Sequence, residues 1–73
     1  MTRADLETEG PPIRIRELVR LTGFSRHKLY ADIRRDELQI VAMRCGQMTY
    51  WHVDRHEALR YLDALGYRWP ATA

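Results

Sequence analysis

The residues best suited to chemistry lie on one face of a segment that spans residues 25–35. At 100° per residue, Leu29 and Ile33 fall on one stripe, which we expect to face the core. The opposite face and its flanks carry these side chains: Arg26, His27, Lys28, Tyr30, Ala31, Arg34 and Arg35. Arginine and lysine can pair with phosphates or guanine edges, and the small Ala31 would let the helix sit deep in a groove. A solvated helix face has a similar composition, so this face alone leaves both interpretations open.

The elements before this face must set its direction. Apolar residues recur at helical spacing over about residues 13–21 and predict a first, short helix. Gly23 can adopt a positive φ and permits a sharp turn, and we expect Phe24 to fill the gap between the two helices. Ser25 is a good N-cap, and the free amide groups after it suit a phosphate. A helix, a glycine-containing turn and a second helix are the plan of a helix-turn-helix unit.

The second helix should cover about residues 26–35 and stop near Asp36, because aspartate tolerates the left-handed conformation better than most residues. Residues 38–44 and 48–53 are rich in β-branched, aromatic and other apolar residues and predict two strands. The turn between these strands consists of Cys45, Gly46 and Gln47. We therefore expect a β-hairpin, with Trp51 in the core.

A third helix is predicted to begin at Asp54, which with Glu57 fits the capping-box pattern, and to end at Gly66. Its apolar stripe is expected to consist of Ala58, Leu59, Leu62 and Leu65. The aromatic tail after it, with Tyr67 and Trp69, is expected to fold back on the core or to meet a neighbouring protomer.

The domain organisation follows from charge and composition. Residues 1–12 are acidic and nearly free of apolar side chains, so we expect a disordered tail before a single domain at residues 13–66 and a short tail at 67–73. Residues 13–36 carry seven Lys or Arg against three Asp or Glu, whereas residues 37–73 balance to zero. Positive charge gathered in one third of the chain favours a polyanion as partner.

Several function classes are disfavoured. A chain of 73 residues has little room for both a scaffold and a deep catalytic cleft, and no nucleophile or carboxylate pair accompanies its three histidines at a recognisable spacing. Cys45 is the only cysteine, so no internal disulfide forms, and with His52 and His56 it lacks a zinc-site spacing. No signal peptide or membrane-spanning run is evident. We expect a cytoplasmic, non-enzymatic protein without cofactor or metal.

A large part of the chain resembles a known protein family. Residues 15–62 are similar to the excisionase-like and AlpA-like winged helix-turn-helix proteins, relatives of the MerR DNA-binding domain. The stretch RELVRLTGFSR (residues 16–26) resembles the first helix and turn of the family, and LYADIRRDEL (residues 29–38) resembles its recognition helix. Asp36 stands where the family usually has glycine. The predicted hairpin and last helix follow in the expected order.

The resemblance implies a mainly α fold with a small β-hairpin, the winged helix-turn-helix, and sequence-specific binding of double-stranded DNA. Its most specific implication is a phage or mobile-element excisionase, which binds adjacent sites cooperatively, bends DNA, assists an integrase and often regulates transcription. Alternatives are a dedicated AlpA-like or MerR-like transcription regulator, or a protein-interaction adaptor. The wing tip, usually basic in the family, here has only Arg44 beside the turn. The expected DNA contacts are Ser25, Arg26, His27, Lys28, Tyr30, Ala31, Arg34, Arg35, Arg44 and Gln47.

Overall fold

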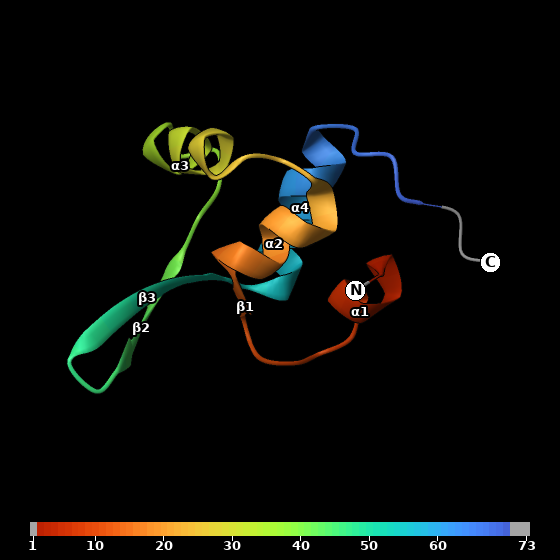
Figure 1. Cartoon of the computed structure of the whole chain (residues 1–73). Helices are drawn as coiled ribbons and strands as arrows, with labels where there is room; N and C mark the ends of the chain where they lie inside the picture. Colours follow the sequence, from red (N-terminus) through yellow and green to blue (C-terminus); the bar gives the residue numbers. More distant parts are fainter. Residues whose placement is uncertain (1, 71–73) are drawn as a thin grey trace.

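The computed structural model describes residues 2–70, which form four helices and a three-stranded antiparallel sheet (Figure 1). In chain order the elements are α1 (Arg3–Glu7), β1 (Ile13–Arg14), α2 (Ile15–Thr22), α3 (Arg26–Arg34), β2 (Val41–Cys45), β3 (Met48–Val53) and α4 (Arg55–Ala64). The predicted succession of helix, turn, helix, hairpin and helix is confirmed as α2, α3, β2–β3 and α4. The helix α1 and the strand β1 are additional.

The N-terminal segment is not the disordered tail that its composition predicts. Thr2 caps α1 through a capping box with Asp5, and Leu6 is completely buried in the core. Arg3 pairs with Asp63 of α4 at 2.7 Å, so the short helix is fastened to the C-terminal helix. The sequence pattern did not indicate this helix, because a single apolar residue, Leu6, forms no periodic repeat. The burial of Leu6 nevertheless supplies the packing that holds α1.

Residues 13 and 14 are the start of the sheet rather than of a helix. Ile13 pairs with Val53 and Arg14 with His52, so β1 lies beside β3 and the strand order is β1-β3-β2. The chain then turns directly into α2, which ends at Gly23 with a φ of 75°. The left-handed glycine expected in the turn is therefore confirmed, and it sets the angle between α2 and α3.

The observed limits of α3, Arg26 and Arg34, agree closely with those predicted from the sequence. The Ser25 hydroxyl accepts a hydrogen bond from the amide of Lys28 at 3.1 Å, as an N-cap should. Asp36 adopts a φ of 63°, the left-handed conformation expected of it just beyond the helix. Leu29 is fully buried and Ile33 packs against the core.

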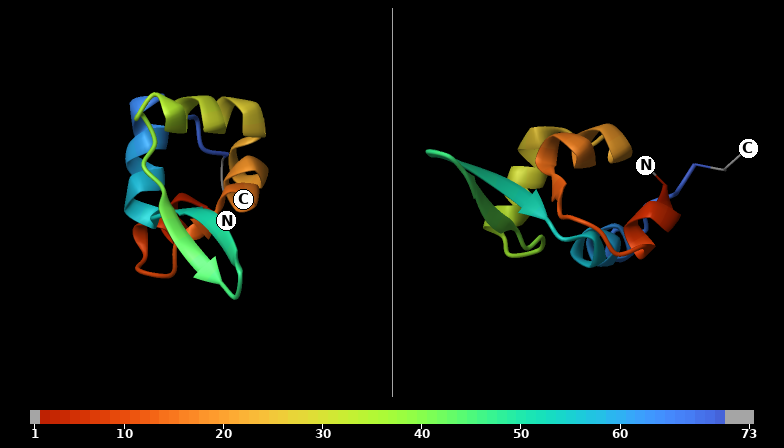
Figure 2. Two further views of the ribbon diagram at one scale, coloured as in Figure 1. Left: turned by 90° about the vertical axis from the view of Figure 1, so that its left-hand side faces the viewer. Right: turned by 90° about the horizontal axis from the view of Figure 1, so that it is seen from below.

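The β2–β3 hairpin projects from the helical body as an arm (Figure 2). Its register pairs Ala42 with Trp51 and Cys45 with Met48, and every residue of β2 is exposed. The strand begins at Val41 rather than at residue 38, because Leu38 is buried in the core. Trp51 is 42% exposed, so the prediction that it is a core residue is wrong. Trp51 lies near the base of the arm, where its ring packs against Tyr30 of α3 instead of entering the core.

The last helix is capped by the Asp54 side chain, which accepts a hydrogen bond from the amide of His56 at 2.9 Å. The predicted capping box does not form, because the Glu57 carboxylate instead accepts from the amide of Gln39 at 2.9 Å and from the Arg60 side chain. Ala58, Tyr61 and Leu62 are buried, whereas Leu65 is exposed and does not belong to the core stripe.

The tail after Gly66 folds back on the domain, as expected. The Tyr67 hydroxyl donates to the carbonyl of Leu21 at 3.0 Å, and the Tyr67 ring packs edge-on against Phe24 and Trp69. Residues 71–73, also part of the predicted tail, lie outside the described residues. Phe24 thus connects the turn before α3 to the C-terminal segment.

Candidate nucleic-acid interface

The outer face of α3 is positive because its one acidic residue points inward. Asp32 is the only carboxylate within Arg26–Arg34, and it is 3% exposed. It accepts hydrogen bonds from the Tyr61 hydroxyl of α4 at 2.5 Å and from the Lys28 ammonium at 3.2 Å. The other predicted contact residues on the helix are exposed, except Lys28 and Ala31, which are half-buried. The sequence analysis assigned Asp32 neither to the core stripe nor to the outer face of the helix, so its burial was not predicted.

The Asp32 carboxylate is held in its charged form. The Tyr61 hydrogen bond lowers the pKa of Asp32 most, followed by contact with Lys28, and together these outweigh the raising effect of burial. Burial and the adjacent carboxylate raise the pKa of Tyr61, so its hydroxyl keeps its proton and remains a donor. A buried polar contact of this kind ties α3 to α4.

Lys28 is less available than its position on the helix suggested. Its ammonium pairs with Asp32, and it also lies 5.4 Å from the centre of the Phe24 ring. Part of its charge is therefore already compensated within the fold. Arg34 makes only a long hydrogen bond, 3.4 Å from Nε to the carbonyl of Tyr30, which leaves its charge free.

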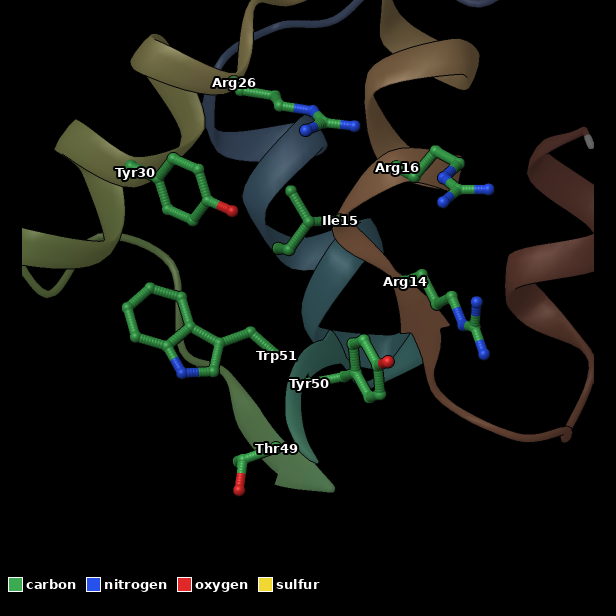
Figure 3. Close-up of a pocket in the computed structure, with 8 residues that line it drawn as sticks. All are labelled: Arg14, Ile15, Arg16, Arg26, Tyr30, Thr49, Tyr50 and Trp51. Atoms are coloured by element: carbon green, nitrogen blue, oxygen red, sulfur yellow. The ribbon is translucent and has the colours of Figure 1, made fainter. Parts of the chain in front are cut away.

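A groove lies on one side of α3, between the first turns of α2 and α3 and the strand β3. It has a volume of about 390 Å³. We call it the arginine groove; its lining residues, shown in Figure 3, are Arg14, Ile15, Arg16, Arg26, Tyr30, Thr49, Tyr50 and Trp51. Among residues 2–70, three arginines and no carboxylate line it. The structure thus joins Arg26 and Tyr30, both predicted contacts, to five polar or aromatic residues that were not predicted as contacts.

Aromatic contacts fix the walls of the arginine groove. Tyr30 of α3 packs edge-on against Trp51 of β3, with ring centres 5.6 Å apart. On the β1 side, the guanidinium of Arg14 lies 5.6 Å from the centre of the Tyr50 ring. The sequence contained these residues, but only the pairing of β1 with β3 brings Arg14 beside Tyr50.

The arginines of α1 and α4 differ from those of the arginine groove. Arg3 and Arg60 pair with carboxylates, and Arg55 donates to the carbonyls of Pro11 and Asp5 at 3.0 and 2.7 Å. These three lie on α1 and α4 and hold the fold together. Within residues 2–70, by contrast, no ion pair involves the arginines of the groove. Their charges are left for an external anion.

The predicted contacts at the wing tip are not brought together with the rest. Arg44 and Gln47 are exposed at the end of the hairpin, and neither lines the arginine groove. Figure 2 shows the tip of the hairpin well away from α3. Cys45, at the same tip, is an exposed free thiol, as expected.

In the part of the chain that the structure describes, no group of three His, Cys, Asp or Glu side chains could hold a metal ion. None of the helices there is long and apolar enough to cross a membrane.

Comparison with known proteins adds no further identification. No protein-family model matches the chain, no curated protein matches its sequence, and no solved structure matches it. Inferences about function therefore rest on the residues and the geometry of the chain itself.

Proposed function

We propose that the protein binds double-stranded DNA in a sequence-specific manner, with α3 as the helix that enters the major groove. In this proposal α2, the turn at Gly23 and α3 form a helix-turn-helix unit, and the β2–β3 hairpin is its wing. His27, Ala31 and Arg34 lie on the side of the helix opposite the buried Leu29, and of these His27 and Arg34 are exposed. Side chains at such positions can reach the base edges.

The observation that carries the proposal is the placement of Asp32. A helix face that is merely solvated usually mixes acidic and basic side chains, which support one another. Here the single carboxylate of α3 is buried against Tyr61, so the outer face keeps only basic and neutral groups. A positive face on a helix that is anchored in the core is more typical of a surface that binds a polyanion than of a merely solvated surface.

The resemblance to excisionase-like proteins supports a more specific role. We propose that the protein is a phage or mobile-element excisionase, which binds adjacent sites, bends the DNA and works with an integrase. A dedicated AlpA-like or MerR-like transcription regulator is the alternative. Footprints on the DNA around the gene separate these roles: several tandem sites at an attachment region support the excisionase, and one site over a promoter supports the regulator.

The DNA-binding proposal itself is tested by selection and titration. Sequences bound from a random pool of duplexes supply a cognate site, and its affinity is then compared with that of a scrambled duplex at several salt concentrations. We expect tighter binding of the selected site and a log–log salt slope of roughly −3 to −5, since the face offers ~3–6 phosphate contacts. A slope near zero on every duplex contradicts DNA binding and favours the protein-interaction adaptor.

A further inference from the structure

We infer that the arginine groove binds the sugar-phosphate backbone of one DNA strand, so that the base of the wing, rather than its tip, contacts the DNA. The inference rests on the proposed function and adds a second contact surface to it. The residues that carry it are Arg14, Arg16, Arg26, Tyr30 and Trp51, of which the first two and the last were not among the predicted contacts.

The positive charge of the groove is uncompensated. Its three arginines come from the strand β1, the start of α2 and the start of α3. Figure 3 shows their guanidinium groups following one another along the α2 side of the groove. None of the described carboxylates lines the groove, so these like charges repel one another until an anion enters. A row of positive charges on different elements fits a chain of phosphates better than it fits one small anion.

The groove lies next to the outer face of α3. Arg26 and Tyr30 occupy the shoulder of the helix that faces β3, and both line the groove. A shoulder of a helix in the major groove meets the wall of that groove, which is the phosphate backbone. A strand that borders α3 on this side would run over Arg26 and Tyr30 and continue towards Arg14. On the opposite shoulder the charge of Lys28 is paired with Asp32, and Arg35 is the basic side chain there that forms no ion pair within residues 2–70.

The aromatic residues of the groove favour a sugar-phosphate backbone over unstacked bases as its ligand. A base stacks on an open ring face. Tyr30 and Trp51 already pack against each other, and Arg14 lies over Tyr50. The rings therefore serve as walls, while the hydroxyl groups of Tyr30 and Thr49 are hydrogen-bond donors suited to phosphate oxygens.

The test compares two variants that each remove two positive charges. Arg14→Gln/Arg16→Gln removes charge from the groove, and Arg20→Gln/Arg68→Gln removes the same charge from exposed positions outside it. Binding to a scrambled 20-base-pair duplex is titrated at several salt concentrations, with circular dichroism to verify folding. We expect the salt slope of the groove variant to be shallower by about 2 units, and that of the control to be close to wild type. Equal slopes for the two variants overturn the inference.

A second readout uses Trp51 as a probe. The variant Trp69→Phe leaves Trp51 as the one tryptophan of the chain. Duplex DNA should change its fluorescence at the same concentrations that give binding, and the change should weaken in the groove variant. Unchanged fluorescence, or a clear preference for a single strand over the duplex, overturns the inference. If Arg34→Ala weakens duplex binding while the groove variant does not, the inference fails and the proposed function stands. If the wild type binds no duplex, the proposed function fails.

Discussion

The hydroxyl of Tyr61 in α4 donates a hydrogen bond to the carboxylate of Asp32 in α3, across 2.5 Å and 29 positions of the chain. Both side chains are buried, and Asp32 is the only buried charged residue among those that the structure describes. A buried carboxylate is costly unless it is hydrogen-bonded, so the pair fixes how α3 can sit on α4. The same contact turns the acidic group of α3 away from its outer face.

We expect Tyr61→Phe to destabilise the fold by about 1–3 kcal/mol, because the ring still fills its place while a buried charge loses a hydrogen-bond donor. Urea unfolding followed by circular dichroism measures the change. Tyr50→Phe, which removes an exposed hydroxyl, is the matched control and should leave the unfolding midpoint near that of wild type. Equal midpoints for Tyr61→Phe and the control would show that the hydroxyl contributes nothing.

Acid should lower the free energy of unfolding through protonation of Asp32. Its pKa is lowered by the Tyr61 hydrogen bond and by Lys28, so the folded state holds the proton less tightly than the unfolded chain does. The resulting stability is complete above the usual aspartate pKa of 3.8 and is lost as the pH falls through the lower, folded-state pKa. We expect the unfolding free energy to fall below about pH 4, and to fall less steeply in Asp32→Asn. Parallel pH profiles would contradict this role of Asp32.

The sequence predicts local features well and contacts between distant segments poorly. Ser25 and Asp36, which bound α3, act through backbone groups within a few residues, and both behave as expected. The arginine groove depends on the pairing of β1 with β3, which joins Arg14 to a strand almost forty positions later. No local sequence pattern predicts that pairing, because a strand of two residues is too short to show a periodic pattern. Arg14 and Arg16 contributed to the basic segment of the sequence but could not be assigned to a site.

The aromatic tail should contribute to stability. Tyr67 donates to the carbonyl of Leu21, and both Tyr67 and Trp69 pack against the core. Truncation after Gly66 removes half-buried aromatic surface, and we expect a loss of roughly 2 kcal/mol. For a chain of this size that corresponds to a fall in Tm of roughly 10 °C. Removal of residues 71–73 alone is the control. An unchanged Tm after the longer truncation would mean that the aromatic packing adds no stability.

The last prediction separates sequence recognition from general affinity on α3. Arg34 lies close to the direction opposite the buried Leu29, whereas Arg35 lies on the shoulder away from the arginine groove. Arg34→Ala should cost about 1–3 kcal/mol on the selected site and relax the preference at one base pair. Arg35→Ala should weaken the selected and scrambled duplexes alike and make the salt slope shallower by about 1 unit.

Arg35 is a better comparison for Arg34 than Lys28, although Lys28 shares the same shoulder of the helix. Lys28→Ala would also remove the ion pair with the buried Asp32, so a change in DNA binding would be mixed with a change in folding. The Arg34 and Arg35 side chains belong to no ion pair in residues 2–70, and both variants should unfold at the wild-type urea concentration. With folding matched, an equal loss on both duplexes for Arg34→Ala would make Arg34 a phosphate contact. The placement of α3 in the major groove would then be wrong, because the side chain directed furthest from the core would not reach a base.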